Sequence, residues 1–433
     1  MTPQSPFTIV APLAAGREAD LRALLESMNQ QPGSADPHNA VLPFGDFAAL
    51  HFARLVLIDD SAMADLAVYG VTPPRLATVL VFMGDCDGAA RDVLGQMAQR
   101  CASGLRQLFG HCEGFDAGAD LLAWMVAHDV PVATFYVCRR GRSVRQVREE
   151  HALWRALAAR VPRDGAAASP EDAQRVRDDL VAFVAAEQRA GRLPLTPPAA
   201  TPLRWQIANL ANLIGVALLG LVALPFLVVL APLLIVMLRR RERSDPEVCP
   251  PLDPDALLAL QRLEDQVPTN QFTAVGPVKP GLFRRWLLTA LLLAADYACR
   301  HVFHRGHLTR IQTIHFARWV FLDGKSRVLF VSNYDGSHEA YMDDFINKVG
   351  WGLNILFSNG VGWPRTDWLV KRGSRRELLF KRYQRRHQVP TQVWYMAYAG
   401  LTLADLERAQ RIREGLERTP SSNAQALAWL RLL

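Results

Sequence analysis

The sequence of 433 residues lacks the standard signatures of catalysis. It contains no nucleophile elbow, no Walker loop, no H-E-x-x-H zinc motif and no dinucleotide-binding glycine fingerprint between a strand and a helix. Its six cysteines include no C-x-x-C pair, and their scatter is typical of reduced, mostly buried thiols. The first residues, MTPQSPFTIVAPL, have neither a basic n-region nor an apolar h-region, so we expect no signal peptide.

A long internal repeat is present instead. The strings HFARLVLIDD at His51 and HFARWVFLDG at His315 are nearly the same, and their neighbours match in the same order. The further pairs are FTIVAPL and FTAVGPV, TVLVFMGDCDG and RVLFVSNYDGS, HDVPVATFYV and HQVPTQVWYM, and SVRQVREEHALWRAL and TLADLERAQRIREGL. Five collinear matches at spacings of 248 to 265 residues indicate two copies of one domain, because the period is too long for a solenoid.

Each copy alternates strand and helix signals. In the first copy the β-rich strings begin at Phe7, His51, Thr78 and Pro131, and the helical patterns cover residues 18–28 and 89–109. A last helix follows Ser143, a good N-cap residue, and Thr402 takes that place in the second copy. The order β-α-β-β-α-β plus one helix is the split βαβ pattern of ferredoxin-like domains. We therefore predict an α+β fold with two tandem ferredoxin-like repeats, whose sheets pack face to face as a pseudo-twofold α+β barrel or lie side by side.

The composition divides the chain into five parts. They are residues 1–165 (first repeat), 166–202 (a polar linker helix), 203–243 (a membrane-embedded hairpin or helix), 244–265 (a linker) and 266–433 (second repeat).

An uncharged apolar run extends from Ile207 to Leu238 and exceeds the roughly 20 residues that span a bilayer. A single tilted crossing would place the two copies on opposite faces of the membrane. A hairpin that turns near Pro225 or Pro232 would keep them on one face, and its arms of about 16 residues would rise only roughly 24 Å each. A buried core helix is the third alternative. We favour the hairpin, re-entrant in one leaflet.

Basic residues flank this run at both ends: Arg204 before it, and Arg239, Arg240, Arg241 and Arg243 after it. They suit two ends on the cytoplasmic face of a bacterial inner membrane. The string GSRRELLFKRYQRRH is typical of a basic interfacial helix, or of a solvated helix with a core-facing stripe. The net charge of +7 is spread out and forms no nucleic-acid-binding motif, so we expect membrane lipid and no nucleic acid as partner.

The order of elements resembles the dimeric α+β barrel superfamily, which includes the dye-decolourising-type heme peroxidases and the chlorite dismutases. The string GDCDG, from Gly84 to Gly88, is similar to the peroxidase motif G-x-x-D-G, whose aspartate works on the peroxide side of the heme. The second copy has SNYDG at this place, and the proximal histidine of the peroxidases has no unambiguous counterpart. The string from IHFARWVFLDG to QVPTQVWYMAY also resembles a widespread bacterial family of membrane-associated proteins with no known activity.

Polar residues inside apolar strands are the candidates for a site. Period-two alternation puts His315 and Arg318 on opposite faces of one strand, and a buried Arg318 needs a partner such as Asp335 or Asp323. Because the first copy repeats the same string, one reading is a hydrogen-bonded brace present in both copies. The other reading is a cavity in the second copy, lined by His315, Arg318, Asn333, Tyr334, Trp394 and Tyr395.

Two functions from different classes follow. In the first, the protein is a membrane-attached heme-dependent oxidoreductase, similar to a peroxidase, with His315 as the axial ligand of the iron. Arg318, Asn333, Asp335 and Tyr395 would be the catalytic residues that act on a hydrophobic, lipid-derived substrate or hydroperoxide. In the second, the chain binds a lipid or a protein partner without catalysis. We expect His128 and His387 to bond to their own backbone, and the oligomeric state stays open.

Overall fold

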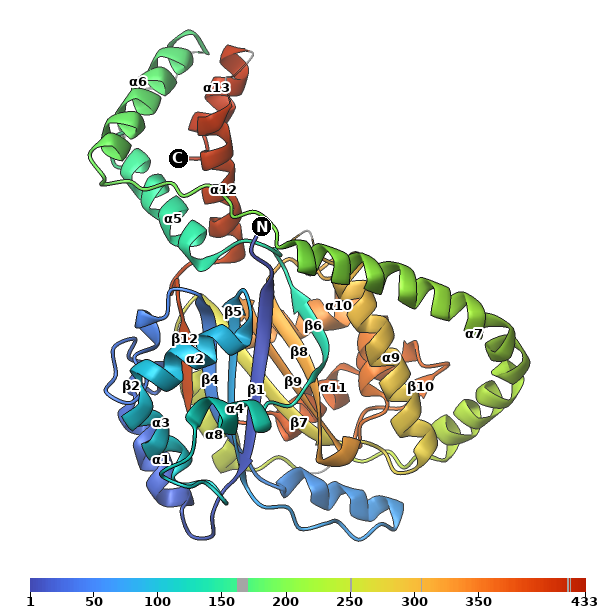
Figure 1. Ribbon diagram of the computed structural model, residues 1–433. Helices are drawn as coiled ribbons and strands as arrows, with labels where there is room; N and C mark the ends of the chain where they lie inside the picture. The colour runs from blue at the N-terminus through green and yellow to red at the C-terminus, as the bar shows by residue number, and fades with distance from the viewer. Residues whose placement is uncertain (162–169, 250, 305, 419, 421) are drawn as a thin grey trace.

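Strands from the two halves of the chain are built into shared sheets (Figure 1). The computed structural model describes residues 1–161, 170–249, 251–304, 306–418, 420 and 422–433, so the predicted boundary between residues 165 and 166 lies outside them. The prediction of a mixed α+β fold is confirmed.

The first half contains β1 (Gln4–Pro12), α1 (Glu18–Ser27), β2 (Asn29–Gln31), β3 (Gly33–Ala35), β4 (Leu50–Ile58), β5 (Val79–Asp87), α2 (Ala90–Arg100), α3 (Ala102–Phe109), α4 (Leu121–Ala127), β6 (Val132–Val137) and α5 (Val144–Ala158). The connecting region contains α6 (Pro170–Arg189), α7 (Leu203–Ser244) and α8 (Pro254–Leu263). The second half contains β7 (Thr269–Pro277), α9 (Leu282–His301), β8 (Ile314–Leu322), β9 (Arg327–Asp335), α10 (His338–Phe357), β10 (Thr366–Asp367), β11 (Lys371–Arg372), α11 (Glu377–His387), β12 (Val393–Met396), α12 (Leu403–Glu417) and α13 (Asn423–Leu430).

Most predicted element types are found, with local differences. Ser143 and Thr402 are confirmed as N-caps, and each sits in a capping box with the residue three positions later. The predicted helix over residues 89–109 is instead two helices that meet at Cys101, whose φ of −122° and ψ of 30° break the helical path. The predicted linker 244–265 also contains a helix, α8, which begins with Pro254 and is capped by Asp253.

The last strand of each half pairs with the other half. The six-stranded sheet has the order β1-β5-β4-β12-β3-β2, and the four-stranded sheet has the order β6-β8-β9-β7. β12 runs antiparallel to β4, and β6 runs antiparallel to β8. The residues just before these strands also reach the neighbouring sheet edges: Val130 N donates to Thr8 O at 2.8 Å beside β1, and Val389 N donates to Thr273 O at 2.9 Å beside β7. Each sheet therefore contains strands from both halves.

The inner faces of the two sheets meet in one aliphatic layer. Its residues come from both sheets: Val56, Ile58, Val79, Val81, Met83, Val275, Val320, Leu322, Leu329 and Val331. The outer face of the six-stranded sheet is covered by α1 to α4, and that of the four-stranded sheet by α9, α10 and α11. The aromatic residues of α11 belong to this cover, because Phe380 and Tyr383 are buried against Trp363. Their burial supports the second of the two predicted alternatives for this segment, a solvated helix with a core-facing stripe.

Four helices project from the sheets as a separate bundle (Figure 1). α6 packs against α13, and α5 packs against α12. Leu180 and Val184 of α6 are buried with Ile412 and Trp429 in the core of this bundle. The predicted polar linker helix is therefore α6, packed into a bundle of its own.

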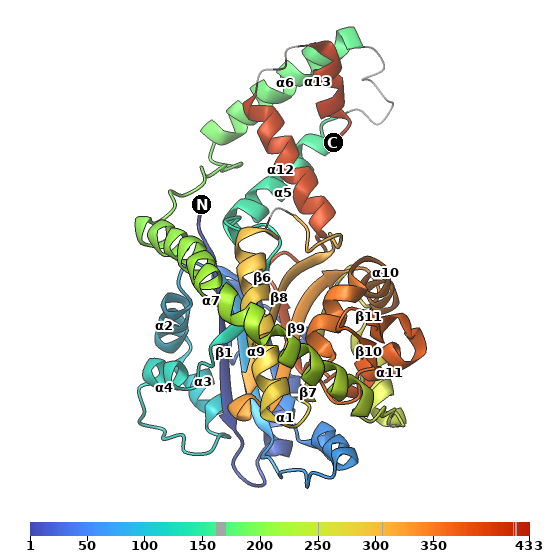
Figure 2. The ribbon, with the colours of Figure 1, turned by 90° about the vertical axis from the view of Figure 1, so that its right-hand side faces the viewer.

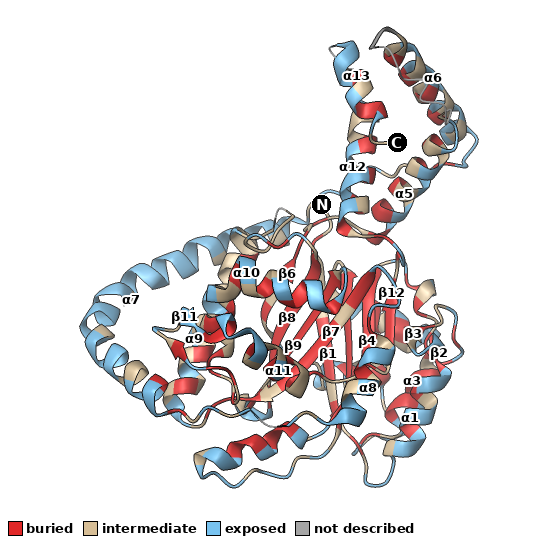
Figure 3. Ribbon diagram, turned by 180° about the vertical axis from the view of Figure 1, so that it is seen from behind, coloured by how far each residue is buried: buried red, intermediate tan, exposed pale blue. Residues whose placement is uncertain are grey.

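The apolar run forms one helix, α7, and the predicted hairpin is wrong. α7 contains both Pro225 and Pro232. A proline removes one hydrogen bond of a helix, and the long leucine- and alanine-rich sequence around both prolines keeps the chain helical. Its most apolar window has no part buried against the rest of the described chain, so it is no core helix. α7 is long and apolar enough to cross a bilayer, and it arches over the outside of α9, exposed over most of its length (Figures 1 and 3).

Candidate functional site

The two histidines of the repeated HFAR string lie at matching β-bulges. The pairing of β4 with β5 shifts register at His51, and the pairing of β8 with β9 shifts register at His315. An extra residue on one strand interrupts the alternation of faces. The ring centroids of His315 and Phe316 therefore both lie near that of Phe52, at 5.6 and 5.5 Å. The predicted alternation of faces along β8 therefore does not hold at His315.

Each of these histidines bonds to an aspartate that also holds the start of a helix. In the first half, His51 Nε2 lies 3.0 Å from Asp87 Oδ1, and the amide of Val144 donates to Asp87 Oδ2 at 2.8 Å. The carboxylate can only accept, so His51 Nε2 donates and leaves Nδ1 to accept from the hydroxyl of Tyr398 at 3.2 Å. The bonds join a strand, a helix N-terminus and a residue from the other half.

The second half repeats this arrangement around His315. His315 Nε2 lies 2.7 Å from Asp335 Oδ1, which also accepts from Thr269 Oγ1 at 2.8 Å. Leu403 N, at the start of α12, donates to the other oxygen of Asp335 at 2.7 Å. The geometry is that of the brace which the repeated sequence suggested.

Heme does not fit at His315 in this arrangement. The imidazole is 1% exposed and its Nε2 is used by Asp335. The cavity that it lines with His51 and Tyr398 has a volume of about 20 Å³, whereas small-molecule and cofactor pockets have volumes of about 300–1,000 Å³. The heme function stays a prediction from the resemblance.

Arg318 reaches across to the first half of the chain. It donates to Phe7 O at 2.7 Å and Gly84 O at 2.9 Å, and it forms a buried ion pair with Asp85. The predicted partners are occupied elsewhere: Asp335 bonds to His315, and Asp323 pairs with Arg327. The partner of Arg318 could not be found within its own half because it comes from the other one.

Arg54 of the first half makes the equivalent contacts to residues of the second half. It donates to Phe272 O at 3.0 Å, to Ser332 O at 3.1 Å and to the amide oxygen of Asn333. Asn333 contacts Arg54 as Asp85 contacts Arg318, so Arg54 is buried beside an uncharged amide. Burial and the neighbouring Arg318 lower the pKa of Arg54 from 12.5 to about 9.

Tyr395 lies apart from the other predicted site residues. Its ring stacks on Phe44 at 5.4 Å within the core of the first half, and its hydroxyl accepts from Arg148 at 3.3 Å. The adjacent Trp394 donates to Asn333 at 3.1 Å. Four of the five predicted site residues thus lie in three separate groups, which are His315 with Asp335, Asn333 with Arg54, and Arg318 with Asp85. Tyr395 lies outside all three.

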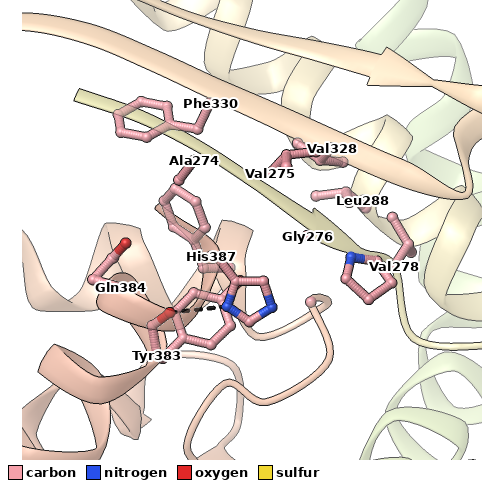
Figure 4. A pocket seen from close by; sticks show the side chains of 13 residues that line it. Ala274, Val275, Gly276, Val278, Leu288, Val328, Phe330, Tyr383, Gln384 and His387 are labelled. Atoms are coloured by element: carbon pink, nitrogen blue, oxygen red, sulfur yellow. Dashed lines mark hydrogen bonds between the residues drawn. The ribbon is translucent and has the colours of Figure 1, made fainter. Parts of the chain in front are cut away.

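His128 and His387 bond to their own backbone, as predicted. Their Nδ1 atoms lie 2.8 Å from Trp124 O and 2.9 Å from Tyr383 O, each one helical turn back. Figure 4 shows His387 beside Tyr383 and Gln384, at a small cavity that Gly276 also lines. This cavity has a volume of about 30 Å³, which accommodates about one water molecule and no larger ligand.

A larger cavity lies between α9 and α10, on the outer face of the four-stranded sheet. Its volume is about 300 Å³, about twice that of an engineered cavity that admits benzene. It is lined by Leu291, Ala294, Ala295, Ala298, Cys299, Phe303, Leu308, Thr309, Ile314, Trp319, Phe330, Phe345, Val349, Trp351, Gly352, Leu353, Ile355 and Leu356. None of these residues is charged, and burial raises the pKa of the Cys299 thiol to about 12, which keeps it protonated. The cavity suits an apolar molecule.

Two polar atoms in the lining have no hydrogen-bond partner among the described residues. They are Nε1 of Trp319, which is 6% exposed on β8, and Oγ1 of Thr309 in the loop before β8. Both atoms have almost no accessible surface, so they lie beneath the surface of the cavity, and the surface that the cavity presents is apolar.

The sequence contained a signal for this cavity, although the prediction of a site did not use it. The helix that begins at Leu282 is far more apolar than its counterpart in the first half, and it carries Ala294, Ala295 and Ala298 on one face. Small residues on one helix face leave a cavity only if the side chains of the facing helix do not fill the space. Which helix faces them is decided by the fold and cannot be read from the sequence. Comparison of the chain with protein-family models, with curated proteins and with solved structures finds no match.

Proposed function

We propose that this protein is attached to a membrane through α7 and binds an apolar, lipid-like molecule in the cavity between α9 and α10. The observation that carries the proposal is the uncharged cavity of about 300 Å³, one wall of which is α9, a helix that α7 contacts. Figure 2 views the molecule from this side, with α7 crossing in front of α9 and α10 beside them.

The start of α7 is bound to the end of α9. Arg300 Nε donates to Asn209 Oδ1 at 2.8 Å, and the hydroxyl of Tyr297 donates to Leu213 O at 3.3 Å. His301 Nε2 also lies 2.8 Å from Asn212 Oδ1. These polar contacts stand at the edge of the apolar run.

The end of α7 is bound to the start of α9 and to the loop between β10 and β11. Glu242, 4% exposed, accepts from Thr366 Oγ1, Trp368 N and Leu369 N at 2.9, 3.0 and 2.8 Å. Asp245 pairs with Arg284 at 2.6 Å. Since the second half holds both ends of α7, we infer that both ends lie on one side of the membrane and that the apolar middle bows into the lipid.

Exposed tryptophans support this orientation. Trp286 on α9, Trp351 on α10 and Trp368 beside β10 are 63%, 53% and 52% exposed. Tryptophan is enriched where a protein meets the membrane–water interface. Trp351 also lines the cavity, so the cavity would open at the lipid surface.

We also propose that the two halves are copies of one ferredoxin-like unit, closed into a pseudo-twofold barrel. The support is that the two halves share equivalent side-chain interactions as well as similar sequences. The bulges at His51 and His315 and the reciprocal contacts of Arg54 and Arg318 occur at equivalent places. The backbone bonds of Val130 and Val389 link the edges of the two sheets.

A photolabelling experiment tests the binding function. The full-length protein in lipid nanodiscs is illuminated with a long-chain methyl ester that bears a diazirine, and the labelled peptides are identified by mass spectrometry. We expect label on α9 and α10, lost in Ala295→Phe, which fills the cavity, and kept in Leu293→Phe, which adds the same ring to the exposed side of the same helix. Equal labelling of α9 and α10 in both variants would overturn the proposal.

Membrane attachment has a separate test. Val228→Arg places a charge in the exposed apolar middle of α7, and Val126→Arg places one on α4. In flotation with liposomes we expect Val228→Arg to shift protein to the soluble fraction and Val126→Arg to behave as the unaltered chain. Flotation that is equal for all three proteins would argue against α7 as the anchor.

A further inference from the structure

A basic surface forms where the end of α7 meets the hairpin of β10 and β11. Its exposed cations come from two segments that are far apart in the sequence and in contact in the fold. They are Arg240, Arg241 and Arg243 on α7, and Lys371, Arg372 and Arg375 on β11 and the turn that follows it. We call these six residues the basic rim.

Buried side chains hold the hairpin in place from two sides. Glu242, in the last turn of α7, accepts from two amides of the hairpin. Asn354 of α10 is 1% exposed, and its Nδ2 donates to Val370 O at 3.0 Å and to Arg372 O at 3.1 Å. These bonds use backbone groups of the hairpin, so its exposed cationic side chains are not needed to hold it there.

The carboxylates that contact the hairpin do not neutralise the rim. Glu242 and Asp367 both pair with Arg239, which is not part of the rim. Asp367 also lies 3.4 Å from Arg372, whose side chain is still 70% exposed. The other five cations of the rim have no carboxylate partner among the residues that the structure describes. The rim therefore presents uncompensated positive charge to its surroundings.

Exposed apolar side chains lie among these cations. Trp368 in the hairpin is 52% exposed, and the guanidinium of Arg239 lies 4.7 Å from its ring centroid. Val370, next to Lys371, is 39% exposed. The rim also directly follows the apolar run of α7. Positive charge beside tryptophan and aliphatic side chains, at the edge of a membrane-length apolar segment, is typical of a surface that binds the anionic headgroups of a bilayer.

We infer that the basic rim binds the headgroups of anionic phospholipids, whose phosphate oxygens accept hydrogen bonds from the guanidinium and ammonium groups. The inference rests on the proposed attachment through α7 and names the class of lipid at the surface of the protein. Arginines at the end of α7 would flank a membrane helix in any fold. The hairpin cations reach the same surface only through the fold, so they provide the sharper test.

Partition of the full-length protein into vesicles tests this inference. Vesicles of phosphatidylcholine are compared with vesicles that also contain about 30% phosphatidylglycerol, an anionic lipid. In about 0.1 M salt we expect half-maximal binding at a lipid concentration about tenfold or more lower with phosphatidylglycerol, because each Lys or Arg near an anionic surface contributes about fivefold. In about 1 M salt, where the Debye length is about 3 Å, most of this preference should disappear.

Two double variants with the same change of charge locate the preference. Lys371→Gln with Arg375→Gln alters the hairpin, and Arg155→Gln with Arg411→Gln alters exposed positions of the projecting bundle, away from the end of α7 (Figure 1). The hairpin pair should reduce the preference for phosphatidylglycerol by about fivefold or more and leave binding to phosphatidylcholine unchanged. The bundle pair should change neither. Lys371→Arg with Arg375→Lys keeps both charges and should keep the preference.

The outcomes separate the lipid class from the attachment itself. An equal preference in the two charge-removing double variants, or no preference in the unaltered chain, would overturn the inference and leave attachment through α7 standing. Absence of binding to both kinds of vesicle would overturn the proposed attachment. Val228→Arg, in the apolar middle of α7, should weaken binding to both vesicles and leave their ratio unchanged.

Discussion

Arg54 and Arg318 differ in one chemical group of their surroundings, and that difference sets their expected contributions to stability. Arg318 faces the buried carboxylate of Asp85, whereas Arg54 faces the amide of Asn333. Both donate to backbone carbonyls of the opposite half. The pair therefore holds the two sheets together through a charged contact on one side and a neutral one on the other.

We expect Arg318→Met to destabilise the protein more than Arg54→Met. The first leaves Asp85 buried without a cation, at a cost of about 3 kcal/mol or more. The second leaves an amide that still accepts from Trp394, at a cost of about 1–3 kcal/mol. Melting temperatures in mild detergent compare the two, and adding Asp85→Asn to Arg318→Met should restore part of the loss. Equal melting temperatures for the two single variants would contradict this ranking.

A second residue-scale prediction concerns acid. Burial, together with Arg386, lowers the pKa of His387 from 6.5 to about 4, and burial beside Arg385 and Lys381 lowers that of His338 to about 3. In the unfolded chain these groups bind protons below about pH 6.5, and in the folded chain they stay neutral to lower pH. The stability that depends on their neutral forms is therefore complete above pH 6.5, and it is lost as the pH falls toward 4 for His387 and toward 3 for His338.

For His387 alone the slope is at most about 1.4 kcal/mol per pH unit between pH 6.5 and 4. His387→Gln should flatten the fall of melting temperature in this window, whereas His38→Gln, on the exposed surface, should not change it. A parallel pH dependence in His387→Gln and the unaltered chain would show that His387 stays charged in the folded protein.

At the scale of elements, α7 is held at its ends and free in the middle. Glu242 joins its last turn to Trp368 and Leu369, which both have positive φ, at 58° and 60°. A backbone conformation of this kind persists only where its surroundings hold it, and the carboxylate that accepts both amides is that support.

We expect Glu242→Ala to release this loop. The amides of Trp368 and Leu369 should exchange with deuterium faster, by about tenfold or more, because each loses a charge-assisted hydrogen bond. Glu247→Ala is the matched control, since Glu247 pairs with the partly exposed Arg376 and, within the described part of the chain, bonds to neither amide. Unchanged exchange at both amides in Glu242→Ala would mean that the loop holds its conformation by other contacts.

At the scale of the whole molecule, the exchange of β6 and β12 makes each sheet depend on both halves. Without the second half, β4 would lack β12 and present a long unpaired edge. Residues 1–201 alone should therefore aggregate, and residues 1–201 co-expressed with residues 202–433 should co-purify as a one-to-one complex. A soluble fragment 1–201 that melts cooperatively by itself would contradict this dependence.

Thiol labelling tests whether both halves lie on one side of the membrane. Cys249, just after α7, is the exposed member of the six cysteines, and His38 in the first half lies on the surface. In cells and in inverted membrane vesicles, a membrane-impermeant maleimide should label Cys249 from the same side as it labels the Cys249→Ser, His38→Cys variant. Labelling from opposite sides would contradict the packing of the two halves on one face.

The sequence by itself determined the types of most elements, the capping residues and the pairs of equivalent positions. These depend on local physics: side-chain periodicity, N-cap chemistry at Ser143 and Thr402, and the i−4 bonds of His128 and His387. The sequence also identified the long apolar run, because the absence of charged residues from a segment can be read directly from the sequence.

Only the tertiary structure decided which half supplies each partner. Asp85 became the partner of Arg318, and the strand with Tyr395 joined the sheet of the first half, because strand exchange places residues from 233 positions or more away beside each other. The cavity was decided in the same way, since empty space depends on how two helices pack and not on either helix alone. Local sequence patterns carry information about neighbours along the chain, and both the brace and the cavity are built from residues that are neighbours only in space.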